Sequence, residues 1–213
     1  MIVTVAHQKG GVGKTTLATN LAQVLGADLL DLDLQQSCVL WNRLRKSTGL
    51  PEILCQVPAS LAEADDIIKA HQGPEKFLIV DCGGFDSVMN RAAILRADLL
   101  LTPVAPSQVE LFGLRNFTSI LDAAGHERGD NIITNVVINN ADSRSQGMIE
   151  ELQSYIRATP AHLRLIDTVI HWRADFKRAY AAGAGVTEYA PKGKAAEEIA
   201  ALAVEIKNMF NSN

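Results

Sequence analysis

Short apolar runs alternate along this chain with longer stretches in which apolar residues recur every three or four positions. The short runs have the length and flanking turns of buried strands, and the longer stretches have the periodicity of amphipathic helices. The expected strands cover residues 2–6, 28–33, 53–57, 77–81, 99–104, 132–139 and 165–170. The expected helices cover residues 14–25, 37–46, 61–71, 88–96 and 109–124, a segment that opens at residue 172, and residues 195–210. This alternation predicts an α/β fold, doubly wound, with a mainly parallel sheet covered by helices on both faces.

Capping residues and apolar stripes refine some of these boundaries. Ser37 is expected to cap the second helix, in which Trp41 is expected to lie in the core. Ser60 and Glu63 have the spacing of a capping box at the start of the third helix. Gly125 is expected to end the helix that begins near residue 109.

Residues 8–16 read Gln-Lys-Gly-Gly-Val-Gly-Lys-Thr-Thr and lie between the first expected strand and the first expected helix. Glycines in such a turn let the backbone direct its N–H groups at a polyphosphate, and the helix adds its positive N-terminal end. Lys14 can reach the β- and γ-phosphates, Thr15 can bind Mg²⁺, and Thr16 can bind the α-phosphate. The alternative is a glycine-rich turn with two exposed lysines. The residues expected to bind nucleotide here are Gly10, Gly11, Val12, Gly13, Lys14, Thr15 and Thr16.

Lys9 precedes the first glycine, so the loop reads Lys-Gly-Gly-x-Gly-Lys-Thr. This spacing resembles the deviant Walker A motif of the ParA/MinD family of ATPases, and the resemblance covers the chain from Ile2 to about Phe210. It implies a homodimer that forms on ATP binding, in which Lys9 of each subunit reaches the nucleotide of the other. Lys9 would then stabilise charge as an arginine finger does in other phosphoryl-transfer enzymes. The alternative is a solvated loop lysine.

Two aspartates end expected strands, at the edge where parallel sheets bind ligands. Asp81 ends four apolar residues in a Walker B pattern, and Asp33 matches the second aspartate of the family's Asp-x-Asp-Pro-Gln motif. The resemblance implies that both hold Mg²⁺ and that Asp33 also positions the attacking water. Asp31 is expected to cap or brace its strand. Leu34 replaces the usual proline, and the segment from Lys14 to Asp33 is shorter than in the family pattern, so this switch segment departs from it.

Asn139 ends the sixth expected strand. Related ATPases place an asparagine against the adenine ring at this point, so the resemblance assigns Asn139 to nucleotide binding. An ordinary turn-forming asparagine at a strand end is the alternative.

Basic residues gather in the last third of the chain. In ParA proteins, arginines at matching positions contribute to non-specific DNA binding by the nucleotide-bound dimer. The resemblance therefore implies contacts with DNA phosphates, which give affinity without sequence choice and weaken with salt. Acidic residues are interspersed among the basic ones, so a solvated surface is the alternative. The residues expected to contact DNA are Arg144, Arg173, Lys177 and Arg178.

The composition limits the remaining classes of function. The net charge is −4, so any DNA contact would need a local basic patch. Cys38, Cys55 and Cys82 are widely spaced, which favours reduced thiols over a disulfide framework or a metal site. No apolar run approaches bilayer length, and a first strand at residue 2 leaves no signal peptide to expect. We therefore expect one cytoplasmic domain spanning residues 1–213, with no membrane partner.

Together the motifs and the resemblance predict a ParA-type partition ATPase that uses ATP and Mg²⁺. Its partners would be a second copy of the chain, non-specific DNA of the nucleoid, and a ParB-like centromere-binding adaptor that stimulates hydrolysis. Repeated cycles would segregate plasmid or chromosomal DNA. The main alternative keeps the ATPase and changes the cargo to a chemoreceptor cluster or a microcompartment. More distant alternatives are a small-molecule ATP-dependent ligase and a nucleotide-switched binding module. The expected catalytic residues are Lys9, Lys14 and Asp33.

Overall fold

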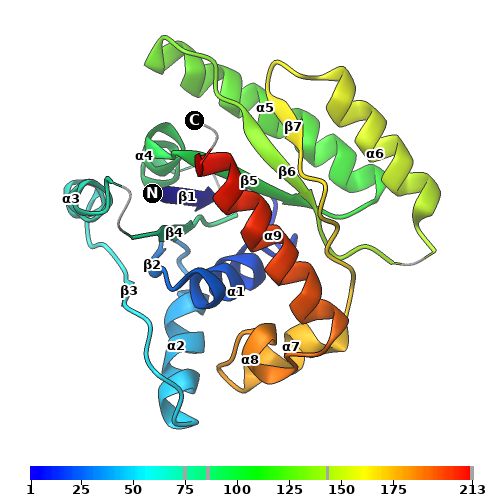
Figure 1. Cartoon of the computed structure of the whole chain (residues 1–213). Coiled ribbons are helices and arrows are strands. Elements are labelled where there is room, and N and C mark those ends of the chain that lie inside the picture. The colour runs from blue at the N-terminus through cyan, green and yellow to red at the C-terminus, as the bar shows by residue number, and fades with distance from the viewer. Residues whose placement is uncertain (74–75, 85–86, 143, 212–213) are drawn as a thin grey trace.

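One parallel sheet forms the centre of the molecule (Figure 1). The computed structural model describes residues 1–73, 76–84, 87–142 and 144–211. Within these residues seven strands pair in the order β3-β2-β4-β1-β5-β6-β7, and every pairing is parallel. The strands are β1 (Ile2–Val5), β2 (Asp28–Asp31), β3 (Cys55–Gln56), β4 (Leu78–Asp81), β5 (Leu99–Val104), β6 (Thr134–Ile138) and β7 (Leu163–Leu165). The predicted fold class is confirmed.

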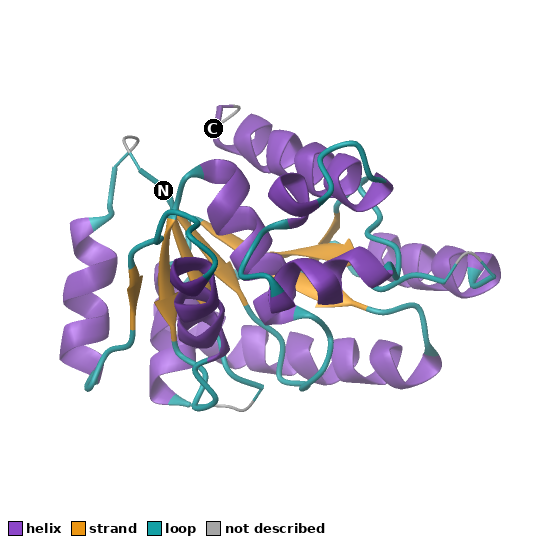
Figure 2. Ribbon diagram, turned by 90° about the horizontal axis from the view of Figure 1, so that it is seen from below, coloured by secondary structure: helices purple, strands orange, loops and turns teal. Residues whose placement is uncertain are grey.

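Helices cover both faces of the sheet, as the view in Figure 2 shows. One face carries α1, α2, α7, α8 and α9, and the other carries α3, α4, α5 and α6. The helices are α1 (Lys14–Leu25), α2 (Ser37–Ser47), α3 (Leu61–Ala70), α4 (Val88–Arg96), α5 (Gln108–Arg128), α6 (Gln146–Ala158), α7 (Ala174–Ala181), α8 (Val186–Tyr189) and α9 (Lys194–Asn211). None of the described helices is both long and apolar enough to cross a membrane.

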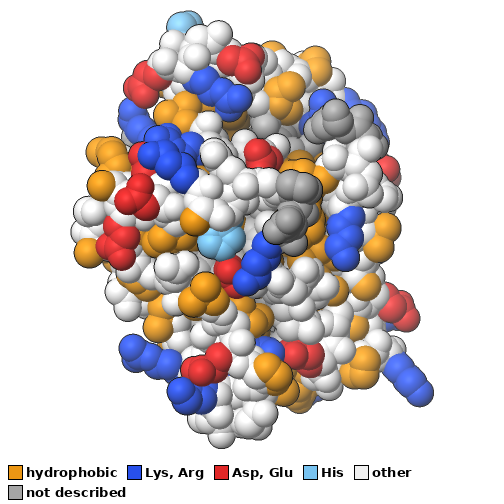
Figure 3. Space-filling model, turned by 60° about the vertical axis from the view of Figure 1, so that its left-hand side comes forward, with side chains coloured by type: hydrophobic (Ala, Val, Ile, Leu, Met, Phe, Trp, Pro, Cys, Tyr) orange, Lys and Arg blue, Asp and Glu red, His pale blue; other side chains and the backbone are white. Residues whose placement is uncertain are grey.

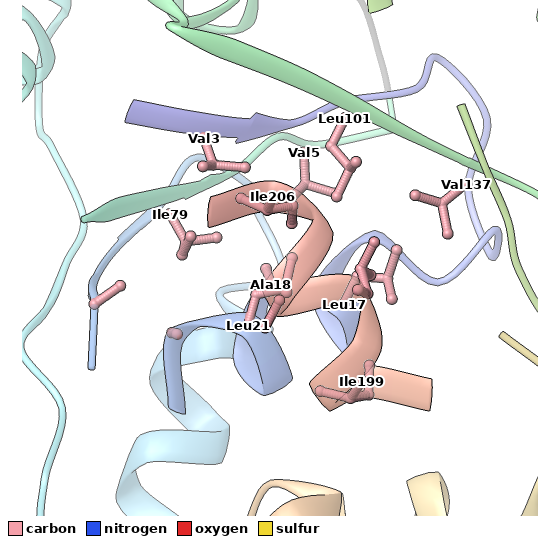
Figure 4. Packing of buried hydrophobic residues seen from close by; sticks show 14 of the residues in the cluster. Val3, Val5, Leu17, Ala18, Leu21, Ile79, Leu101, Val137, Ile199 and Ile206 are labelled. Atoms are coloured by element: carbon pink, nitrogen blue, oxygen red, sulfur yellow. The ribbon is translucent and has the colours of Figure 1, made fainter. Parts of the chain in front are cut away.

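Side chains of β1 alternate between the two faces, as the pleat of a strand requires. Val3 and Val5 pack against α1 and α9, whereas Ile2 packs toward α4 and α5. Figure 4 shows the first of these layers, in which α1 and α9 lie together beneath the strands. Trp41 is fully buried in the same layer, so its predicted place in the core is confirmed.

The start of α2 differs from the prediction. Ser37 is the first helical residue, not the cap, and the residue before it, Gln36, has a left-handed backbone with no capping side chain. The buried carboxylate of Asp31 instead accepts the N–H groups of Cys38 (2.9 Å) and Val39 (3.3 Å). A side chain from β2 therefore satisfies the first turn of α2, and local sequence alone could not show this.

The predicted end of α5 at Gly125 is also wrong. The helix continues to Arg128, and Gly129, with φ +74°, forms its left-handed C-cap. A Cβ on Gly125 would lie 2.7 Å from the carbonyl oxygen of Asp130, so glycine is required there because the chain folds back closely. The capping box of α3 is half formed: Ser60 Oγ accepts the Glu63 N–H, but the Glu63 carboxylate accepts from Ala59.

The last strand also differs from its expected range. The ladder is formed by Leu163–Leu165, and the chain then departs from a regular strand. The carboxylate of Glu205 on α9 accepts the N–H groups of Asp167 (2.8 Å) and Thr168 (3.1 Å), so these groups bond to α9. The helices α6 and α8 have no counterpart among the expected helices.

Candidate nucleotide site

The phosphate-loop sequence occupies the turn from β1 into α1. Gly11 and Gly13 have positive φ angles of 80° and 95°, which other residues adopt only at a cost. A Cβ on Gly13 would overlap the side-chain amide of Asn139. α1 begins directly after Gly13 and has no acidic residue in its first turn, so its positive end remains available to an anion.

Lys14 is buried within this turn. Its Nζ donates a hydrogen bond of 2.8 Å to the carbonyl oxygen of Lys9. Burial lowers the pKa of Lys14, while the nearby carboxylates of Asp81 and Asp33 act in the opposite direction. Gly84, which follows β4, lies so close that a Cβ there would be 3.1 Å from the Gly10 nitrogen. The structure thus brings the lysine, both predicted aspartates and the segment after β4 around one loop.

Asp81 is fully buried at the carboxyl end of β4. Its Oδ2 accepts hydrogen bonds from Thr15 Oγ1 (2.7 Å) and from the Cys38 thiol (3.3 Å). Its Oδ1 has no hydrogen-bond partner among the described residues. Burial raises the pKa of Asp81 to about 7. An unpaired carboxylate oxygen beside a hydroxyl is a donor set that fits Mg²⁺, because hard cations prefer oxygen ligands.

Asp31, Cys38 and Asp81 place ligand atoms within 4.8 Å of one another. Asp31 already accepts three N–H groups, including that of Asp33 (3.1 Å), which fits the expectation that it braces the strand. Burial raises the pKa of the Cys38 thiol well above its ordinary value, so this sulfur is protonated. Asp33 is half-buried and accepts the N–H of Gln35 (2.9 Å).

Lys9 forms an ion pair with Glu110 of the same chain, on the first turn of α5. The structure therefore holds Lys9 against its own subunit, with its side chain about one-third exposed. Lys9 N–H also donates to His7 Nδ1 (3.0 Å), which fixes the backbone just before the glycines. Neither His7 nor Glu110 is among the residues predicted from the sequence, although a histidine that follows an apolar strand before a phosphate loop is a usable signal.

Asn139 lies beneath the loop, where its Nδ2 donates to the carbonyl oxygen of Val12 (2.7 Å). Next to it is a cavity of about 280 Å³ that also touches Gly13, Thr16 and, from the segment after β7, Trp172 and Lys177. Its position beside the phosphate loop is suited to the base and ribose of a nucleotide. In the structure as described, Asn139 supports the loop that borders this cavity.

The four predicted DNA-binding residues differ in their surroundings. Arg144 is almost fully exposed and pairs with Asp142 (3.2 Å), and Arg178 lies 3.8 Å from Asp175. Arg173 is held by Glu198, with Nη2 to Oε1 at 2.5 Å. Lys177 lines the cavity next to the phosphate loop. Figure 3 shows one face of the molecule, on which charges of both signs are mixed.

Comparison with known proteins places this site in a family. The family model described as "CobQ/CobB/MinD/ParA nucleotide binding domain" matches residues 3–186. The chain belongs to this family. It is therefore a ParA/MinD-type ATPase, which confirms the predicted resemblance and enzyme class.

Individual relatives refine the comparison. The chain is 27% identical to maintenance of carboxysome distribution protein A of Halothiobacillus neapolitanus, covering 95% of this chain and 94% of that protein. It is 27% identical to the chromosome partitioning protein ParA of Caulobacter vibrioides, covering 60% and 63%. The solved structure of apo McdA from Cyanothece has a TM-score of 0.74 at 18% identity, covering 96% of this chain and 98% of that one.

These relatives correct the order of the two functional predictions. DNA partition was the main prediction and positioning of another cargo the alternative. The carboxysome-distribution relative matches nearly end to end, whereas the partition relative from Caulobacter matches less than two thirds of either chain. The alternative is the better supported of the two.

Proposed function

We propose that this chain is an ATP-driven positioning protein whose cargo is a protein-shelled microcompartment. The observation that carries the proposal is the match along 95% of the chain to a protein named for carboxysome distribution. The phosphate loop, the buried Asp81 and the lysine that precedes the glycines supply the nucleotide chemistry that such a role needs.

In this proposal the backbone of the loop and Lys14 bind the phosphates of ATP, and Thr15 and Asp81 hold Mg²⁺ together with Asp33. The bound ion would neutralise charge that develops on the phosphates. Support comes from the Thr15–Asp81 hydrogen bond and the unpaired Asp81 oxygen. Asp33 is the residue assigned to orient the attacking water.

The proposed active form is a homodimer, in keeping with a family whose members typically dimerise. Large apolar side chains, each more than half exposed, lie after the carboxyl ends of β2, β4 and β5, at the edge of the sheet that carries the phosphate loop. They are Leu34, Val88, Val109 and Phe112. Closure of two copies through this edge would bury them and exclude water from the nucleotide. Lys9 would leave Glu110 and reach the partner's phosphates.

The ATP-bound dimer would use non-specific DNA as its support. Arg144 is exposed and lines a cavity that shares His171, Trp172 and Arg173 with the cavity beside the phosphate loop, and Arg178 is exposed on α7. Nucleotide-driven closure would place two copies of this surface together. An adaptor attached to the cargo would stimulate hydrolysis and release the dimer. This cargo-bound adaptor replaces the ParB-like centromere-binding adaptor that the sequence predicted.

Deletion of the gene in its source cell tests the cargo. The proposal predicts that fluorescently labelled microcompartments lose their even spacing and cluster, while plasmid and chromosome inheritance is unchanged. Complementation with the wild-type gene should restore spacing, and the Lys14→Ala variant should not. Evenly spaced compartments together with loss of plasmids or chromosomes would contradict the proposal and favour DNA partition as the function.

A further inference from the structure

A second large cavity lies at the opposite edge of the sheet from the phosphate loop. It has a volume of about 550 Å³, within the range of small-molecule sites. It is formed where β5, β6 and β7 begin, between the ends of α4 and α5 and the last turns of α9. Figure 1 shows this end of α9 beside α4. Nothing in the nucleotide chemistry uses it.

Asn135 supplies a hydrogen-bonding group that the protein leaves open. The residue is 6% exposed, and its Nδ2 donates to the carbonyl oxygen of Leu100 (3.1 Å). Its Oδ1 has no hydrogen-bond partner among the described residues, although the side chain lines the cavity. A buried amide oxygen without a donor costs about 1–3 kcal/mol, so this atom favours a ligand that carries a hydroxyl or an amine.

The acidic side chains of the cavity already accept hydrogen bonds from the protein, whereas its arginines are largely unpaired. Both carboxylate oxygens of Glu205 accept hydrogen bonds from Asp167 and Thr168, and Asp98 accepts the N–H of Ile2 (2.8 Å). Arg164, in contrast, is exposed on β7, and its guanidinium has no ion pair or hydrogen bond to any residue in the described part of the chain.

Arg128 also faces the cavity and is only weakly engaged. Its Nη1 donates to the carbonyl oxygen of Leu95 at 3.3 Å, and its Nη2 lies 3.9 Å from Asp130. Two guanidinium groups of this cavity are thus available to bind a ligand, whereas its carboxylates already accept hydrogen bonds from the protein. Guanidinium groups bind carboxylates and phosphates through charge-assisted hydrogen bonds.

We propose that this cavity binds a small organic anion. Arg164 and Arg128 hold its carboxylate or phosphate, and Asn135 Oδ1 accepts a hydrogen bond from its hydroxyl or amine. Ile132, Ile133 and Met209 line the same cavity and contact the carbon skeleton. The site is separate from the nucleotide site and does not depend on the cargo proposed above.

Nuclear magnetic resonance titration of the full chain tests the site with citrate and with glycerol 3-phosphate. Both probes combine an oxyanion with a hydroxyl, and the comparison distinguishes carboxylate from phosphate. The proposal predicts saturable shifts of the Asn135 side-chain amide and the Arg164 Nε–H with at least one probe. These signals distinguish binding at the cavity from binding at the phosphate loop, which also attracts anions.

Variants and a matched ligand complete the test. Arg164→Gln should weaken binding about 10-fold or more, the loss expected for one charge-assisted hydrogen bond, whereas Arg43→Gln, an exposed arginine of α2, should bind like wild type. If citrate binds, tricarballylate, which lacks its hydroxyl, should bind more weakly because Asn135 stays unpaired. Shifts confined to the phosphate loop, or equal affinities for wild type and Arg164→Gln, would overturn the proposal.

Discussion

His7 is a buried histidine directly before the phosphate loop. Burial, and then the charges of Lys14 and Lys9, lower its pKa to about 4. The ring stacks on Phe117 at 5.5 Å, and its Nδ1 accepts the Lys9 N–H, which requires the neutral form. At neutral pH the residue therefore positions the loop without carrying charge.

This lowered pKa gives folding stability a dependence on pH. Because the folded state disfavours the charged ring, the contribution of His7 is present above the unfolded pKa of 6.5 and is lost as the pH falls toward about 4. The difference between the unfolded and folded pKa values of His7 corresponds to about 3 kcal/mol in the free energy of unfolding. Urea unfolding at pH 7 and pH 4.5 should show that His7→Asn loses less stability on acidification than wild type. His126→Asn, at an exposed histidine, should follow wild type. Parallel losses in wild type and His7→Asn would contradict this explanation.

Whether a functional residue could be predicted from the sequence depends on how far along the chain its partners lie. Lys14 and Thr15 stand in one contiguous motif, and Asp81 ends an apolar strand, so local pattern was sufficient to propose them. Glu110 was not predicted because its ion pair with Lys9 joins residues that are 101 positions apart in the sequence. The pairing exists only because the phosphate loop and the start of α5 meet at the same edge of the sheet.

Among the elements, α2 is held to the α7–α8 connection by a compact set of contacts. The guanidinium of Arg45 donates to the carbonyl oxygen of Gly183 (3.0 Å) and pairs with Glu188 (2.7 Å). It also lies over the ring of Trp41, 4.8 Å from the centroid. Gly183 has φ +66°, and a Cβ there would overlap the backbone of α2. This junction requires a glycine for both reasons.

Gly183→Ala should therefore destabilise the fold more than an alanine at an open left-handed glycine. Gly49, with φ +79° and no atom near its missing Cβ, is the matched control. Gly49→Ala should cost about 1–2 kcal/mol from backbone strain alone. Gly183→Ala should cost about 1–3 kcal/mol more from overpacking. Denaturant titration measures both values, and equal values would show that α2 moves aside without cost.

The elements also show which features hydrophobic periodicity can and cannot predict. The bounds of α1, α4 and β5 agree with prediction, because strong periodicity and clear breakers coincide there. The start of α2 was missed because Asp31 acts on it from β2, so a contact between elements sets that boundary. The end of α5 was missed because the helix continues through Gly125 and the later glycine, Gly129, forms its left-handed C-cap.

For the whole molecule, the ion pair between Lys9 and Glu110 is expected to compete with dimer formation. Lys9 must leave Glu110 before it can reach a partner subunit. Glu110→Gln should therefore shift ATP-dependent dimerisation to lower protein concentrations. Sedimentation velocity with ATP over a concentration series measures the shift. An unchanged or weaker dimer would mean that Glu110 does not restrain Lys9.

DNA binding should depend on the exposed arginines and only in the ATP-bound state. Arg144→Gln and Arg178→Gln should each weaken DNA retention and reduce the salt dependence of binding, by about one unit of log–log slope per lost phosphate contact. Affinity for ATP should not change, because both side chains are exposed and pair with Asp142 and Asp175. Filter binding with ATP at several salt concentrations is the assay, with Arg43→Gln as control. Retention that is insensitive to both substitutions would remove these arginines from the DNA surface.

Light scattering of the protein with ATP, with ADP and without nucleotide is the most direct test of the shared nucleotide site. Wild type should be a dimer only with ATP. Lys14→Ala should neither bind ATP nor dimerise, whereas Lys9→Ala should bind ATP with nearly normal affinity and remain a monomer. A Lys9→Ala protein that dimerises with ATP as wild type does would contradict the role assigned to Lys9 across the two subunits.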